Sequence, residues 1–76
     1  KHIDYAMESL RILYWDSQTL RQRIAIPDFF LKEENKIVEI KSEHTLDLQN
    51  MIDKKRAYID HGYNFVLYVD KERRDI

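Results

Sequence analysis

The stretch IPDFFLKEENKIVEIKS, residues 26–42, contains two apolar, strand-like runs separated by a charged turn. Three ionisable residues interrupt these runs: Asp28 in the first, and Glu39 and Lys41 in the second. Side chains alternate between the faces of a strand, so Glu39 and Lys41 are expected on one face, about 6.6 Å apart. An ionised carboxylate in an apolar stripe is costly unless it is paired or binds a metal. The stretch therefore predicts a β-hairpin that carries a polar site.

The remaining chain predicts a single small α/β domain, residues 1–76, with the element order α-β-β-β-α-β. Apolar spacing indicates a short helix over about residues 2–10. Strands are expected at residues 12–15, 21–31, 37–41 and 65–69. A longer helix is expected to begin near Asp47, with Thr45 or Asp47 as its N-cap, and to end before Gly62. The first three strands are expected to form a meander, and the long helix to bring the last strand parallel to the third.

Composition narrows the class of protein. The net charge of −1 excludes a globally basic nucleic-acid clamp but leaves a local basic patch open. Without cysteine, disulfides and thiolate metal sites are excluded. No apolar run is long enough for a membrane helix and no signal-peptide pattern is present, which predicts an intracellular, cytoplasmic protein. The chain starts without methionine, and we expect a fragment or one domain of a longer product.

The three ionisable residues suit metal-assisted hydrolysis of a phosphodiester. Mg²⁺ or Mn²⁺ prefers oxygen ligands, and two carboxylates on neighbouring strands, Asp28 and Glu39, would provide them. Lys41 beside them could position or deprotonate water, or stabilise negative charge. Pro27 cannot donate to a ladder, so a bulge there would re-aim Asp28. The alternative is structural: a solvated Glu-x-Lys pair on the open face of a sheet, and a Pro-Asp pair in a turn.

Pro27-Asp28, followed after ten residues by Glu39-Ile40-Lys41, resembles the PD-(D/E)xK nuclease superfamily of restriction, repair, recombination and homing endonucleases. The longer strings IPDFF, VEIKS and DKKRAYIDHGYNF are similar to small phage and viral nucleases related to homing and very-short-patch-repair-like enzymes. The resemblance covers about residues 12–70. It implies a restriction-endonuclease-like core, a small mixed sheet flanked by helices, and a DNA endonuclease of bacterial, phage or viral origin that uses a metal-activated water.

The resemblance also implies roles for individual residues. Asp28 and Glu39 would bind Mg²⁺ or Mn²⁺ together with the main-chain carbonyl of Ile40. Lys41 would be the catalytic lysine. Many members of the superfamily add an acidic residue from the first helix, and Glu8 is the candidate here. Spacing alone would make Glu8 a solvated helix residue.

Further residues are candidates for DNA contact because of their positions. Three follow the active-site strand directly, one falls on the apolar side of the long helix, and two alternate on one face of the second strand: Ser42, His44, Thr45, Lys55, Arg21 and Arg23. Each has a structural alternative. His44 would be an exposed loop residue, Lys55 would extend its stem over the sheet edge, and the arginines would cover a solvated hairpin face.

Two other functions remain open. The chain could be a non-cleaving, nuclease-fold DNA-binding module of a recombination or replication assembly. It could also be an interaction domain that matches the motif by chance. Nucleases of this class often cut both strands as oligomers, so a homodimer or a larger homo-oligomer is a further expectation, although no interface is visible in the sequence.

Overall fold

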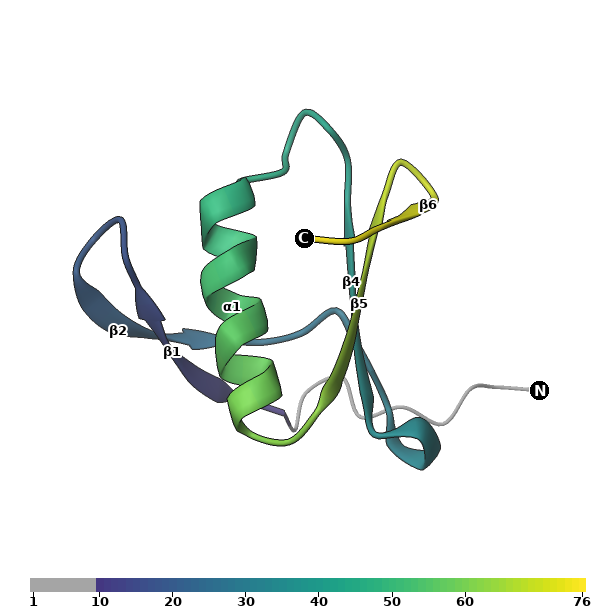
Figure 1. Cartoon of the computed structure of the whole chain (residues 1–76), viewed down its shortest axis with the longest axis horizontal. Helices are drawn as coiled ribbons and strands as arrows, with labels where there is room; N and C mark the ends of the chain where they lie inside the picture. Colours follow the sequence, from purple (N-terminus) through teal and green to yellow (C-terminus); the bar gives the residue numbers. More distant parts are fainter. Residues whose placement is uncertain (1–9) are drawn as a thin grey trace.

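The computed structural model describes residues 10–76, in which six strands form two sheets beside one α-helix (Figure 1). In chain order the elements are β1 (Ile12–Asp16), β2 (Arg21–Ala25), β3 (Phe29–Leu31), the 3-10 turn η1 (Lys32–Glu34), β4 (Lys36–Lys41), α1 (Leu48–Asp60), β5 (Asn64–Val69) and β6 (Glu72–Arg74). The predicted α/β class is confirmed. The predicted helix over residues 2–10, and Glu8 with it, lie outside the described residues. No helix in residues 10–76 is long and apolar enough to cross a membrane.

The main sheet has the strand order β3-β4-β5-β6. β3 and β4 form an antiparallel hairpin, and β4 pairs with β5 in parallel through the crossover helix α1, as predicted. The described residues contain one α-helix, which packs on one face of this sheet through Met51 and Tyr58. The prediction of a sheet flanked by helices is therefore wrong for this part of the chain. The opposite face leaves Ile40 and Tyr68 exposed.

The predicted meander is confirmed in its antiparallel pairings, residues 12–16 with 21–25 and residues 29–31 with 36–38, but the prediction of one continuous sheet is wrong. The run over residues 21–31 is interrupted at residues 26–28, so β2 ends at Ala25 and β3 begins at Phe29. The buried Pro27 has no N–H for a ladder, which explains why strand pairing stops there. β1 and β2 instead form a separate two-stranded sheet, which lies across α1 from β4 and β5 (Figure 1).

The helix begins and ends as its sequence predicts. The side chain of Asp47 accepts a hydrogen bond from the backbone N–H of Asn50 at 3.1 Å, so Asp47 is the N-cap. Gly62 follows the helix with a φ of +91°, a left-handed value that glycine adopts without a Cβ penalty. Tyr63 then donates its N–H back to the carbonyl of Tyr58 at 3.0 Å.

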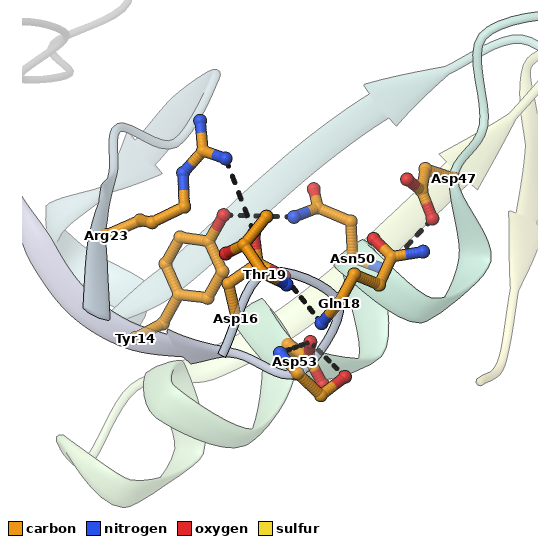
Figure 2. Close-up of polar contacts among 9 residues, drawn as sticks. Tyr14, Asp16, Gln18, Thr19, Arg23, Asp47, Asn50 and Asp53 are labelled. Carbon is orange, nitrogen blue, oxygen red and sulfur yellow. Dashed lines mark hydrogen bonds and ion pairs between the residues drawn. The ribbon is translucent and has the colours of Figure 1, made fainter. Parts of the chain in front are cut away.

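The β1–β2 hairpin is fastened to α1 by polar contacts (Figure 2). Asp53 of α1 accepts two hydrogen bonds from Ser17 in the hairpin turn, from its backbone N–H at 2.8 Å and from its hydroxyl at 2.9 Å. Tyr14 of β1 accepts a hydrogen bond from the amide nitrogen of Asn50 at 2.9 Å. Ile12 and Tyr14 complete the contact from the apolar side, in one core cluster with α1. The hairpin is thus held by its turn and by its inner face.

The turn of this hairpin is organised around Asp16, whose side chain is buried. Its Oδ1 accepts the backbone N–H groups of Gln18 and Thr19 at 2.9 and 3.3 Å, and its Oδ2 lies 3.4 Å from Nη1 of Arg23. Burial alone would raise the pKa of Asp16, but these N–H groups and the Arg23 guanidinium outweigh it and lower the pKa. Arg23 therefore has a structural partner, while half of its side chain remains exposed.

Candidate metal and phosphate site

Glu39 lies in the centre of β4, on the face that α1 covers, and only 2% of its surface is exposed. The hydroxyl of Tyr58, from α1, donates a hydrogen bond to Oε2 of Glu39 at 2.6 Å. Tyr58 itself is fully buried. The expectation that Glu39 and Lys41 share one face agrees with the alternation along β4, but a solvated Glu39 on an open sheet face is wrong. Glu39 is a buried carboxylate, the class of group that needs a specific partner.

Asp28 lies where the β3–β4 ladder ends. Phe29 pairs with Val38, so Asp28 comes next, opposite Glu39. Oδ2 of Asp28 accepts the backbone N–H of Ile40 at 2.8 Å, in the position that a main-chain carbonyl would take if the ladder continued. The break at residues 26–28 thus turns the carboxylate of Asp28 toward β4, and Asp28 is only partly exposed.

The charges around Glu39 act in opposite directions on its pKa. Burial raises the pKa above its ordinary value of 4.5, and the negative charge of Asp28 raises it further. The hydrogen bond from Tyr58 and the charges of Lys54 and Lys41 lower the pKa without cancelling the effect of burial. Burial, followed by the charge of Glu39, also raises the pKa of Tyr58 above its ordinary value of 10.0. Tyr58 therefore stays a hydrogen-bond donor at any pH at which the protein would be used.

Two lysines accompany the carboxylates. Lys41 ends β4 on the same side as Glu39, and Lys54 approaches from α1, where its Nζ lies 5.7 Å from the centre of the Tyr14 ring. The candidate Lys55 instead donates a hydrogen bond to the carbonyl of Ile76. The helix lysine whose charge acts on the pKa of Glu39 is Lys54.

Sequence reasoning missed both Lys54 and Tyr58 as partners of Glu39. Their signal was present in the helical spacing: Met51, Lys54 and Tyr58 follow one another at intervals of three and four residues, which places them on one face of α1. Met51 and Tyr58 are buried, so this is the face that packs on the sheet.

The hydrogen bonds described for the other candidates do not connect them to this centre. Ser42 and Thr45 lie in the turn after β4 and bond to each other, with 3.1 Å between their hydroxyl oxygens. His44 is exposed in the same turn, and Arg21 is exposed on β2. In the sequence, Arg21 precedes the two carboxylates, and Ser42, His44 and Thr45 follow them. The hydrogen bonds of Ser42 and Thr45 do not reach Asp28 or Glu39.

The sequence predicts that the residues around Glu39 bind a divalent cation, and the structure shows how many side chains could do so. Within residues 10–76, no group of three or more histidine, cysteine, aspartate or glutamate side chains could hold a metal by itself. A complete protein cage of the zinc or calcium kind is therefore not present in this part of the chain. Mg²⁺ is typically held by one or two carboxylates, with substrate oxygens and water completing its shell. Asp28, Glu39 and the carbonyl of Ile40 offer that smaller set.

Comparisons with protein-family models, with curated proteins and with solved structures found no match.

Proposed function

We propose that this domain is a divalent-metal-dependent endonuclease that hydrolyses DNA phosphodiester bonds. The proposal is supported by Asp28 at the end of the β3–β4 ladder, which lies close enough to the buried Glu39 for its charge to raise the pKa of Glu39, with Lys41 on the same strand. Burying a charged carboxylate beside a second one costs folding free energy. Such arrangements are common at functional sites, where a cation or a reaction uses the charge.

The arrangement of the elements supports the same proposal. The resemblance to PD-(D/E)xK nucleases requires an antiparallel hairpin that carries the acidic residues and the lysine, followed by a helix and a parallel strand. β3, β4, α1 and β5 have that order and that pairing. The motif residues lie just beyond the last β3–β4 pair, Phe29 with Val38, rather than at the turn of the hairpin.

Each residue then has a role. Asp28, Glu39 and the carbonyl of Ile40 would hold Mg²⁺ or Mn²⁺, and the cation would supply positive charge to the phosphate and lower the pKa of water. Lys41 would stabilise negative charge on the phosphate oxygens or orient the attacking water. Lys54 balances the two carboxylates before substrate binds, because its charge favours the ionised form of Glu39. The substrate is proposed to be DNA, with Arg21, Ser42, His44 and Thr45 as phosphate contacts.

A non-cleaving, nuclease-fold DNA-binding module is the second candidate, and one observation favours it. The Glu39 carboxylate is almost completely covered, and one of its oxygens already accepts the hydrogen bond of Tyr58. A group in that state can serve as an internal polar anchor of the fold without any metal. Metal binding and cleavage therefore have to be measured separately.

The deciding experiment compares wild type with Asp28→Asn. Calorimetry with Mn²⁺ is expected to show one carboxylate-dependent site in wild type, and an affinity at least about tenfold lower in Asp28→Asn. Supercoiled plasmid with Mg²⁺ should be nicked by wild type and not by the variant. Asp75→Asn is the matched control, because the Asp75 side chain is 95% exposed. Metal binding without nicking would support the non-cleaving module, and nicking by Asp28→Asn at the wild-type rate would contradict the site.

A smaller effect is expected for Tyr58→Phe, which removes the hydrogen bond to Glu39 and keeps the ring. Groups that orient a metal ligand typically contribute about 10- to 100-fold to metal affinity, so we expect about a tenfold weaker Mn²⁺ affinity. Calorimetry measures this, with Tyr68→Phe on the opposite face of the sheet as control. An unchanged affinity in Tyr58→Phe would show that Tyr58 does not position Glu39 for metal.

A further inference from the structure

Lys54 belongs to a row of side chains on α1 that connects the β1–β2 hairpin with the proposed site. Asn50, Lys54 and Tyr58 follow one another at intervals of four residues, so they lie on one side of the helix. At one end of the row, the amide of Asn50 donates a hydrogen bond to the hydroxyl of Tyr14 at 2.9 Å (Figure 2). At the other end, the hydroxyl of Tyr58 donates to Glu39 at 2.6 Å. Lys54 therefore occupies the turn of α1 between two contacts, one with each sheet.

The ring of Tyr14 holds the Lys54 side chain in this place. Nζ of Lys54 lies 5.7 Å from the centre of that ring, within the distance of a cation–π contact. Tyr14 is 4% exposed and belongs to the core cluster, so the ring is a fixed surface. Burial raises the pKa of Glu39, and the charge of Lys54 is among those that oppose this effect. The ammonium group therefore lies between the hairpin and the carboxylates.

Lys54 is a cation without an anionic partner in the part of the chain that the structure describes. It is partly buried, yet it forms no ion pair and donates no hydrogen bond to another described residue. Its basic neighbours differ in this respect. Arg23 of the hairpin is paired with Asp16, and Lys55 donates to the carbonyl of Ile76. An ammonium group carries three donors, so those of Lys54 are open to an acceptor from outside the fold.

The acceptor that suits this position is a phosphate oxygen. A positive charge in front of the carboxylates attracts an anion, and it repels a second metal ion. Lysine binds phosphate as a compact point charge with rotatable donors, and this contact does not depend on the base. The proposed substrate carries such a phosphate at each nucleotide, so a strand that enters the site places more than one of them near α1.

We propose that Lys54, positioned by Tyr14, binds the backbone phosphate next to the scissile one, on the side of the β1–β2 hairpin. The inference rests on the proposed nuclease function, because it takes Asp28 and Glu39 as the place of cleavage. Lys41 serves the scissile phosphate from the end of β4, and Lys54 serves the neighbouring phosphate from α1. Tyr14 is then a positioning residue that acts through Lys54. The hairpin thereby takes part in substrate binding.

The salt dependence of DNA affinity tests the phosphate contact. Fluorescence anisotropy of a labelled duplex is measured in EDTA at several KCl concentrations, so that neither metal nor cleavage is needed. Each phosphate contact contributes about 0.9 to the slope of log affinity against log salt, and Lys54→Met should reduce the slope by that amount. The affinity should fall about five- to tenfold at ~0.1 M salt. Lys32→Met, in the exposed β3–β4 turn, is the matched control and should keep the wild-type slope.

The positioning role of Tyr14 is tested in two backgrounds, with circular dichroism to check the fold. Tyr14→Leu removes the ring and should weaken DNA binding about two- to fivefold, the range that a cation–π contact contributes. In a Lys54→Met protein the same substitution should have no further effect, because no charge is left to position. Tyr14→Phe keeps the ring and should keep the wild-type affinity. An equal loss in both backgrounds would overturn the positioning role.

The phosphate contact and the proposed nuclease can fail separately. A wild-type slope in Lys54→Met, or a wild-type chain that does not bind the duplex in EDTA, would overturn the contact whatever the cleavage result. The expected change of slope without nicking of plasmid by wild type would support the contact and contradict the nuclease. In steady-state cleavage, Lys54→Met should raise KM and leave kcat nearly unchanged. A fall in kcat with KM unchanged would overturn the assignment of Lys54 to the neighbouring phosphate.

Discussion

Glu39→Gln is expected to abolish cleavage and, at the same time, to stabilise the folded protein. Glutamine has nearly the same shape and can still accept the hydrogen bond of Tyr58, but it cannot supply a negative oxygen to a cation. If Glu39 binds metal, cleavage should fall by at least about 10³-fold, as when a group central to charge stabilisation is lost. A residue that only supported the fold would not combine lost activity with gained stability.

The stability part follows from the sign of the pKa shift. In the folded state the pKa of Glu39 is raised above 4.5, because burial disfavours the charged form. Its contribution to stability is fully present below the unfolded pKa and is lost as the pH rises through the folded pKa. Above that pH, Glu39→Gln should therefore be the more stable protein, by about 1 kcal/mol. The two proteins should converge below pH 4.5.

Urea unfolding across a pH series, in the presence of a chelator, measures this difference. Glu33→Gln is the matched control, because Glu33 is exposed in the β3–β4 turn. Adding Mn²⁺ should then stabilise wild type and leave Glu39→Gln unchanged, since a ligand stabilises the state that binds it. A Glu39→Gln protein that is less stable than wild type at neutral pH would show that the ionised carboxylate supports the fold.

Lys41→Met is expected to separate metal binding from chemistry. Methionine retains a long apolar side chain and removes the charge at the end of β4. Since Lys41 is not proposed as a ligand, Mn²⁺ affinity should stay within about threefold of wild type. Cleavage should fall by about 10²- to 10³-fold, because a fixed positive charge near the phosphate is lost.

Single-turnover cleavage and calorimetry on the same preparation test this pair of results. Lys32→Met, in the exposed turn of the hairpin, is the matched control. Cleavage by Lys41→Met at the wild-type rate would remove Lys41 from the chemistry. Loss of cleavage in Lys54→Met instead would assign the role to Lys54. The two lysines can be compared because the charge of each acts on Glu39.

The central part of the fold could be predicted because local pattern and tertiary structure agree there. The change from strand to helical periodicity at Asp47, and the glycine after the helix, place α1 and the strand that follows it. The alternation of Val38 to Lys41 correctly assigned Glu39 and Lys41 to one face. Such patterns reflect local preferences over a few residues, and the tertiary structure agrees with them here.

The parts that could not be predicted depend on contacts between distant residues. The run over residues 21–31 reads as one strand with a bulge at Pro27, but the division into two strands in two sheets, with Asp28 bonded to the N–H of Ile40, is not contained in that pattern. β6 is a charged, three-residue strand that exists because β5 offers it an edge. Burial of Glu39 depends on α1 and Tyr58, which the strand sequence does not contain.

The hydrogen bond between Asp28 and Ile40 lies at the end of the β3–β4 hairpin that is opposite the turn at residues 32–34. The turn and the proposed site are therefore separate parts of the hairpin. The carboxylates lie at the open end of β3 and β4, and the turn at residues 32–34 joins the closed end, exposed throughout. The exposed side chains of Lys32 and Glu33 can therefore change without touching Asp28 or Glu39, whereas the backbone of Glu34 and Asn35 is held by Asn64. Substitution of Asp28, just before β3, is not tolerated in the same way. Asp28 both bonds to the N–H of Ile40 and supplies the proposed metal ligand.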